Sequence, residues 1–81
     1  MFTVYAISSL IKNYIYVGLT IDLEDRFKRH NSGYEKTTRS YRPFELLYTE
    51  KHQSRIKARE REKYLKSGVG KEFLKDLLKK K

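Results

Sequence analysis

The chain has 81 residues, with nineteen Lys and Arg against ten Asp and Glu, a net charge of +9 and no cysteine. A chain this short buries only about 60% of its unfolded surface, which predicts one domain over residues 1–81 and excludes a separate substrate domain. The lack of cysteine excludes disulfides and thiolate zinc sites. The positive charge favours a polyanionic partner, either nucleic acid or an anionic membrane surface.

Two short segments near the N-terminus alternate between apolar and polar residues, as strands do. They are FTVYAI at residues 2–7 and YIYVGL at residues 14–19. The connection between them is short, which predicts an antiparallel hairpin. A turn centred between Leu10 and Ile11 would place Tyr5 opposite Tyr16 on the same face, although Lys12-Asn13 offers better turn chemistry.

Residues 20–33 carry the start and stop signals of a helix. Asp22 can cap it, with Asp25 three residues later, and Asn-Ser-Gly at residues 31–33 can end it. The helix is therefore predicted over Leu23 to His30, with Leu23 and Phe27 as apolar anchors. Two polar side chains four residues apart then border the buried stripe: Arg26 and His30.

The second half of the chain predicts a strand followed by helical segments. FELLYTE at residues 44–50 places Phe44, Leu46 and Tyr48 on one side of a strand. In the following helix, Ser54 is the expected cap and Gly68 the expected terminator. Its apolar face contains a carboxylate, because three residues share one side by their spacing: Ala58, Glu62 and Leu65.

The C-terminal segment KEFLKDLLKKK is the one stretch that resembles a membrane-surface helix. Its apolar residues are more simply explained by docking on a small core; they are Phe73, Leu74, Leu77 and Leu78. The chain contains no run of 18 apolar residues, and its N-terminus enters a strand-like pattern directly. We therefore expect a soluble cytoplasmic protein with no membrane partner.

Each unusual polar residue has an ordinary structural explanation when it is considered alone. Strand tyrosines are commonly core aromatics, and an arginine stem can cover apolar surface. Glu62 has Arg59 and Lys66 at helix-neighbour spacing, which predicts a surface ion pair. A histidine near a helix C-terminus suits the helix dipole.

Considered together, in order and spacing, these residues resemble the GIY-YIG nuclease domain. The matching segments cover nearly the whole chain and follow the pattern of the small free-standing bacterial members: TVY at 3–5, YVG at 16–18, T-x-D-L-x-x-R-x-x-x-H at 20–30, then NSG, TTRSYRPFELLY and SRIKAREREK. The chain departs from that pattern at Thr3, which replaces glycine, and at Val17, which replaces isoleucine. A second histidine found in some members is absent, residues 36–39 occupying its region, and a late asparagine has no match.

The resemblance implies an α+β fold, with a small antiparallel three-stranded sheet flanked by helices and the active site on one face of the sheet. It also implies a set of site residues in this chain: Tyr5, Tyr16, Arg26, His30 and Glu62. Gly18 matches the motif glycine, where a side chain would crowd the site. Glu62 matches the ligand of a divalent metal, which we expect to be Mg²⁺ or Mn²⁺.

Hydrolysis of a DNA phosphodiester explains why those residue types occur together. Arginine offers a permanently charged fork for phosphate oxygens, and a metal held by Glu62 would stabilise charge near the departing 3′ oxygen. Tyr5 or Tyr16 could orient or deprotonate the attacking water with help from His30, and the sequence leaves open which tyrosine does so.

We therefore expect a metal-dependent endonuclease that is directed by DNA structure, because so small a chain has little surface for reading sequence. DNA is the expected partner; branched or damaged DNA and plain duplex stay open as its form, and a protein partner could supply specificity. A catalytically silent nucleic-acid-binding module is the alternative; it would keep the charge and the fold without needing Glu62. A purely structural domain explains the strands but not the ordered polar set.

Overall fold

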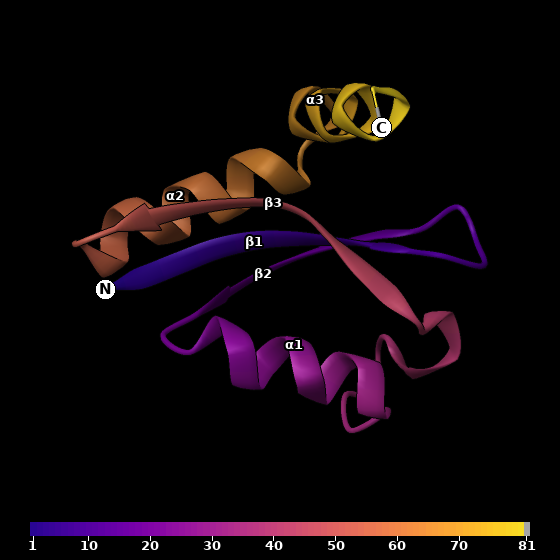
Figure 1. Cartoon of the computed structure of the whole chain (residues 1–81). Helices are drawn as coiled ribbons and strands as arrows, with labels where there is room; N and C mark the ends of the chain where they lie inside the picture. Colours follow the sequence, from indigo (N-terminus) through magenta and orange to yellow (C-terminus); the bar gives the residue numbers. More distant parts are fainter. Residues whose placement is uncertain (81) are drawn as a thin grey trace.

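Three antiparallel strands form the centre of the computed structural model, which describes residues 1–80. The strand order is β2-β1-β3, with β1 at Phe2–Ser9, β2 at Ile15–Thr20 and β3 at Phe44–His52 (Figure 1). The helices are α1 at Leu23–Ser32, α2 at Arg55–Lys66 and α3 at Gly68–Lys79, with a short 3₁₀ turn, η1, at Arg39–Tyr41. The predicted α+β fold with a three-stranded antiparallel sheet is confirmed.

The hairpin register differs from the prediction. Tyr5 lies opposite Gly18, and Tyr16 lies opposite Ile7, so the predicted pairing of Tyr5 with Tyr16 is wrong. The connection is held by Ser9, whose hydroxyl accepts hydrogen bonds from the backbone N–H groups of residues 11 and 12. This local bonding centres the turn one residue later than predicted. Because the shift in pairing is an even number of residues, both tyrosines still share one face of the sheet.

Strand β3 contains a bulge that changes which face its second half presents. Ala6 pairs with Tyr48 while Ile7 pairs with Leu46, which leaves Leu47 as an extra residue. The prediction that Tyr48 shares a side with Phe44 and Leu46 is therefore wrong, because one inserted residue reverses the alternation beyond it. Tyr48 instead packs edge-on against Phe73 of α3, with ring centroids 5.3 Å apart.

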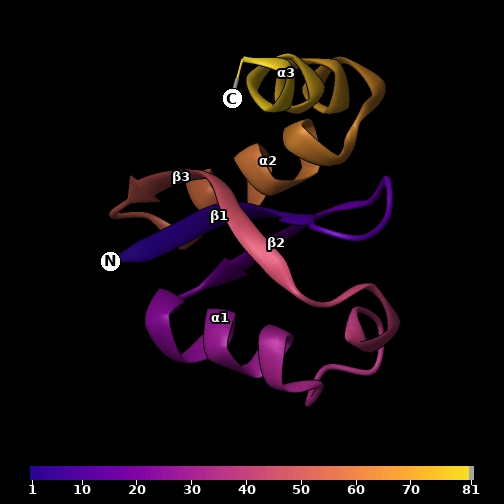
Figure 2. The same cartoon turned by 45° about the vertical axis from the view of Figure 1, so that its right-hand side comes forward.

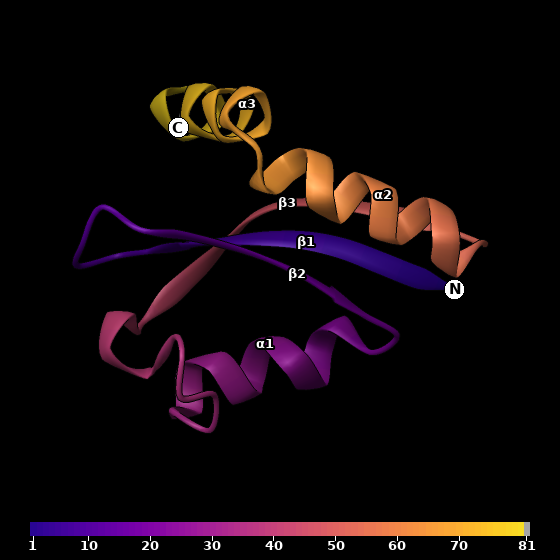
Figure 3. The ribbon, with the colours of Figure 1, turned by 180° about the vertical axis from the view of Figure 1, so that it is seen from behind.

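Helices cover both faces of the sheet and divide the core into two clusters. Helix α1 lies on one face, and α2 and α3 lie on the other, in each of three views (Figures 1, 2 and 3). Leu23 and Phe27 of α1 pack against the cluster that contains Tyr5 and Ile7, as their predicted anchoring role requires. The other cluster joins strand residues to the buried side of α2 and α3: Val4, Ala6, Val17, Ala58, Leu65 and Leu74.

The ends of α1 follow the predicted capping chemistry. The Asp22 carboxylate accepts from the backbone N–H of Asp25 at 3.1 Å, and Gly33 ends the helix in the left-handed conformation with φ 84°. The helix extends two residues beyond its predicted end at His30. Asn31 then fixes α1 to the start of β3, because its side-chain amide exchanges two hydrogen bonds with the backbone of Phe44.

Helix α2 buries the predicted face, but its end differs from the prediction. Ala58, Glu62 and Leu65 are its buried residues, and the Ser54 hydroxyl accepts from the backbone N–H of residue 57. Gly68 does not terminate a helix but begins α3, because the hydroxyl of Ser67 caps α3.

Helix α3 docks on the core, as expected for the apolar residues of the C-terminal segment. Leu74 is fully buried and Leu77 packs against the same cluster, whereas Lys81 lies outside the described residues. Gly70 permits the close approach to α2, since a Cβ there would stand 2.2 Å from the carbonyl oxygen of Tyr64. Across residues 1–80, no helix has the length and apolar character needed to cross a bilayer.

A polar network beside the cluster under α2 and α3 ties β3 to α2. Both carboxylate oxygens of Glu50 accept from Arg61, at 2.9 and 3.1 Å, and the carboxylate also bonds His52 and the Tyr48 hydroxyl. Burial alone would raise the pKa of Glu50, but the hydrogen bonds from Arg61, His52 and Tyr48 outweigh it and lower that pKa from 4.5 to about 2. The folded protein therefore strongly favours ionised Glu50.

We expect Glu50 to make stability depend on pH in acid. Because its pKa is lower in the folded chain, its stabilisation is complete above about pH 4.5 and is lost as the pH falls toward 2. Glu50→Gln should lower the free energy of unfolding at pH 7 by on the order of 3 kcal/mol and flatten its pH dependence below 4.5, as measured by urea denaturation.

The matched control for this prediction is Glu24→Gln. The Glu24 side chain is 85% exposed and, among residues 1–80, forms an ion pair with Lys28 alone, so its loss should cost less than about 0.5 kcal/mol. Equal stability curves for the Glu50 and Glu24 variants would contradict the assigned role of the network.

Candidate active site

Three of the five candidate residues line one cleft. Tyr16 from β2, Arg26 from α1 and Glu62 from α2 lie around a space of about 390 Å³. Because α1 and α2 cover opposite faces of the sheet, a cleft lined by both lies at the sheet edge, along β2. The candidate residues of this cleft therefore meet at an edge of the sheet, whereas the resemblance implied a site on one face. The edge location arises because β2 is an outer strand with no further strand beside it.

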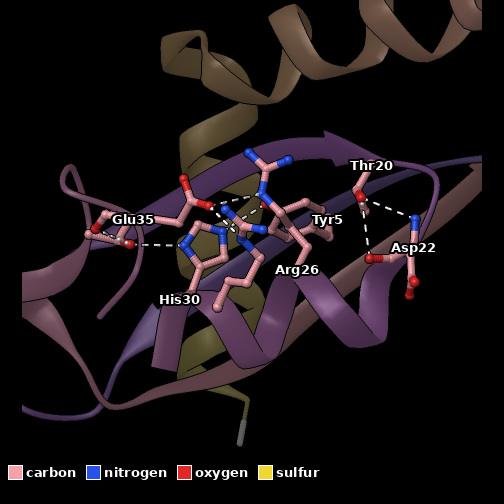
Figure 4. Close-up of polar contacts among 8 residues, drawn as sticks. Tyr5, Thr20, Asp22, Arg26, His30 and Glu35 are labelled. Atoms are coloured by element: carbon pink, nitrogen blue, oxygen red, sulfur yellow. Dashed lines mark hydrogen bonds and ion pairs between the residues drawn. The ribbon is translucent and has the colours of Figure 1, made fainter. Parts of the chain in front are cut away.

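The other two candidates, Tyr5 and His30, form a buried row behind the cleft. The Tyr5 hydroxyl lies 2.8 Å from Nε2 of His30 (Figure 4). Nδ1 of His30 lies 2.8 Å from Oγ1 of Thr38. The Thr38 hydroxyl donates to the backbone carbonyl of Glu35. Its oxygen is then free to accept from Nδ1–H, so we assign Nε2 as the acceptor for the Tyr5 hydroxyl.

Burial keeps both members of this row uncharged. Burial and the neighbouring Tyr16 raise the pKa of Tyr5, while the smaller effect of Arg26 lowers it. Burial also lowers the pKa of His30, against the opposing influence of Glu35. Tyr5 and His30 are fully buried, so neither side chain meets solvent directly.

Gly18 is required because the Tyr5 ring crosses over it. A Cβ on Gly18 would stand 2.5 Å from the Tyr5 hydroxyl oxygen and 2.7 Å from the carbon that bears it. These distances are shorter than any normal contact, so the cross-strand pair of Tyr5 and Gly18 fits only without a side chain at residue 18. The tyrosine can then reach His30 on α1.

Arg26 combines a cleft position with an unsatisfied donor. Its Nε atom is buried and has no hydrogen-bond partner within the described residues. The closest carboxylate is that of Glu35, 3.7 Å away, and this carboxylate bonds Arg29 at 3.2 Å instead (Figure 4). Two further guanidinium groups, Arg55 and Arg59, line the same cleft. The cleft therefore concentrates positive charge and suits an anionic ligand.

Glu62 is held between two cations. One carboxylate oxygen accepts from Arg59 at 2.9 Å, and the other lies 3.2 Å from Nζ of Lys66. The predicted ion-pair partners are thus correct, but the carboxylate itself is buried and does not lie on a solvated helix face. No group of three or more His, Asp or Glu side chains in residues 1–80 is arranged to hold a metal ion.

A single carboxylate nevertheless fits the requirements of a magnesium-type ion. Such ions keep several waters and commonly take only one or two protein carboxylates together with substrate phosphates. Glu62 lies at an open, cation-lined cleft where a phosphate could supply the remaining oxygens. The donor set present is therefore compatible with a divalent ion that is shared between protein and substrate.

Comparison with known families matches residues 1–75 to the model described as the GIY-YIG catalytic domain. The chain belongs to the GIY-YIG family. This is a nuclease family whose members generally use divalent metal ions. No curated protein and no solved structure showed significant similarity to the chain.

The two tripeptides that name the GIY-YIG family are Thr3–Tyr5 and Tyr16–Gly18 in this chain, and they meet at one cross-strand pair, Tyr5 with Gly18, on β1 and β2. Their contact explains why a motif tyrosine and a motif glycine occur together. Sequence reasoning missed Thr38 and Glu35, which lie in the loop after α1. Loop residues follow no helical or strand period, so only the structure could place them beside His30 and Arg26.

We predict that Gly18→Ala disturbs both stability and activity in this GIY-YIG protein. The added methyl group must displace the Tyr5 ring, which should lower the free energy of unfolding by about 1–3 kcal/mol and weaken the contact with His30. Urea denaturation measures the first effect, and nuclease assays measure the second.

Gly68→Ala provides the control, since a Cβ there meets no atom within 4 Å and Gly68 opens a helix. Its effect should be neutral or stabilising by up to about 1 kcal/mol. If the two alanine variants were equally stable, the proposed close approach at Gly18 would be incorrect.

Proposed function

We propose that this protein is a divalent-metal-dependent endonuclease that hydrolyses DNA phosphodiester bonds and is directed by DNA structure. The observation that carries the proposal is the convergence of Tyr16, Arg26 and Glu62 from three different elements in one cationic cleft. A phenol, a guanidinium and a carboxylate supply the three kinds of group that metal-assisted hydrolysis of a phosphodiester uses.

In this proposal Glu62 holds Mg²⁺ or Mn²⁺. The ion, when bound, supplies Lewis-acid stabilisation of the charge that develops on the departing 3′ oxygen. The remaining positions around it belong to water and to phosphate oxygens, in keeping with the single carboxylate available.

Arg26 binds the scissile phosphate. Its guanidinium lines the cleft and its side chain is about a third exposed, so the outward N–H groups can donate to phosphate oxygens. The charge on the nonbridging oxygens grows toward the transition state, where a planar fork contributes more than it does in the ground state.

Tyr16, not Tyr5, is the phenol that contacts the attacking water. Tyr16 lines the cleft, whereas Tyr5 is buried behind it with a raised pKa and with His30 as its hydrogen-bond partner. The His30 ring lies 4.9 Å from the Tyr16 ring, centroid to centroid, and so supports it from behind. We therefore assign positioning roles to Tyr5 and His30.

Recognition of DNA structure follows from the chemistry of the cleft. Its cationic side chains bind phosphates, and phosphate contacts fix position without reading bases. Branched or damaged DNA then provides the geometry that selects the site, and a protein partner adds specificity where one is needed. The whole chain, residues 1–81, acts in this proposal as one domain in the cytoplasm.

A catalytically silent DNA-binding module is the second candidate. One observation favours it: both oxygens of Glu62 are engaged by Arg59 and Lys66, so the carboxylate is not free in the protein alone. Such a module would keep the cationic cleft and its salt-dependent affinity for DNA without cleaving it.

Replacement of Glu62 separates the two candidates. Glu62→Gln keeps the helix and the side-chain volume but removes the proposed metal ligand, so cleavage should vanish while DNA binding persists or tightens. The assay incubates each protein with labelled branched, nicked and linear DNAs in Mg²⁺, Mn²⁺ or EDTA.

Glu60→Gln is the matched control, because Glu60 is exposed on the other side of α2 and carries the same charge. It should cleave like the parent. Cleavage by Glu62→Gln at the parental rate would remove Glu62 from the site, and no cleavage by the parent on any DNA would favour the silent module.

Removal of the hydroxyl should affect cleavage at one tyrosine and stability at the other. Tyr16→Phe should lower single-turnover cleavage by at least about a hundredfold with little change in stability. Tyr5→Phe leaves Nε2 of His30 without its partner and should lower the free energy of unfolding by about 1–3 kcal/mol, which urea denaturation measures. A stable Tyr16→Phe protein with full activity would exclude Tyr16 as the group that contacts water.

A further inference from the structure

One face of α2 carries a row of charged residues centred on Glu62. Arg55, Arg59, Glu62 and Lys66 follow one another at spacings of four, three and four residues, which places them along a single side of the helix. The eleven steps between successive residues from Arg55 to Lys66 rise about 16 Å along the helix, the length of about five nucleotides along one strand of a duplex. The row therefore places cations on both sides of one carboxylate, over a length similar to that of a short stretch of a DNA strand.

The two cations that hold Glu62 are themselves accessible. The Glu62 side chain is only 9% exposed, whereas those of Arg59 and Lys66 are 49% and 52% exposed. Solvent, and hence a phosphate, can therefore reach both cations. Neither cation has another carboxylate partner among the ion pairs of residues 1–80.

These cations also lie on either side of the candidate site. Arg59 lines the cleft with Glu62 and Arg26, and Lys66 lines a neighbouring depression of about 260 Å³ together with Lys71. Tyr16 forms a wall of both spaces. A strand that crosses the cleft along β2 thus meets Arg59 before Tyr16 and Lys66 after it.

We propose that Arg59 and Lys66 bind the phosphates that flank the scissile phosphate and release Glu62 as they do so. The inference rests on the proposed function and adds a coupling to it: DNA binding frees the carboxylate, so DNA and the divalent ion bind cooperatively. The free protein accordingly has a weak metal site, and the site becomes complete only on the substrate.

Electrostatic interactions explain why DNA binding should strengthen metal binding and not weaken it. Two cations about 3 Å from the Glu62 oxygens repel a divalent ion and compete with it for the same lone pairs. Phosphates neutralise the cations and offer them equivalent oxygen acceptors, which removes the competition. Thermodynamic linkage then requires the ion to raise DNA affinity by the same factor as DNA raises affinity for the ion.

The first test measures Mn²⁺ binding to the DNA-free protein by electron paramagnetic resonance. Lys66→Gln should bind Mn²⁺ about 1.5- to 5-fold more tightly than the parent, because one competing cation has been removed. Lys57→Gln, an exposed change on the opposite side of α2, removes the same charge and should leave Mn²⁺ affinity unchanged. Arg59→Gln should behave like Lys66→Gln.

The second test measures DNA affinity in EDTA at several salt concentrations. Lys66→Gln should lower the slope of log affinity against log salt by about one, as expected for loss of one phosphate contact, while Lys57→Gln should not. Glu62→Gln should bind DNA more tightly than Glu60→Gln, and that gain should shrink in the Lys66→Gln background, since both changes act on one contact.

The outcomes distinguish this inference from the proposed function. If Glu62→Gln binds Mn²⁺ as well as the parent does, Glu62 is not the metal ligand and the proposed function loses its metal site. If Mn²⁺ binding requires Glu62 but Lys66→Gln and Lys57→Gln have the same Mn²⁺ affinity and the same salt slope, the coupling is overturned and the metal site stands. Circular dichroism melting curves verify that each variant is folded.

Discussion

The hydrogen bond between the Tyr5 hydroxyl and His30 is the contact on which the arrangement of the site depends. It joins the central strand to α1, and it exists because Gly18 leaves room for the Tyr5 ring to pass. His30 in turn bonds Thr38 in the loop after α1 and packs behind Tyr16, which forms a wall of the cleft. The Tyr5–His30 bond therefore helps to position both the loop and that wall. Neutral, hydrogen-bonded partners suit this buried position, because a charge there would be costly.

The cleft shows how a very basic protein keeps its cations ordered. Glu35 lies between Arg26 and Arg29, and Glu62 lies between Arg59 and Lys66. Each carboxylate reduces repulsion among neighbouring cations without filling the cleft. The side chains are therefore already positioned before a polyanion arrives, which reduces the ordering cost of binding.

Helix signals and family motifs were readable from the sequence, whereas strand pairing was not. Asp22, Gly33 and Ser54 act through local hydrogen bonds, so their roles at helix ends were predicted correctly. The hairpin register and the bulge at Leu47 depend on pairing with β1, which no local pattern encodes. The candidate residues were likewise found by motif, but the location of their cleft at the β2 edge required knowing which face each helix covers.

The bulge in β3 constrains how the length of this chain can vary. Before Leu47, the even-numbered residues of β3 face α1. After Leu47, the even-numbered residues face α2 and α3. Deleting Leu47 alone would remove the bulge but leave Leu46 opposite Ile7 and Tyr48 opposite Ala6, so Tyr48 and Glu50 would keep their faces and Glu50 would still reach Arg61. The bulge is therefore a point where β3 can lose a single residue and keep its pairing, whereas one residue inserted or deleted in the regular part of the strand would reverse every side chain beyond it. The strand thus contains a permitted site for evolutionary change in length that its amino-acid composition does not reveal.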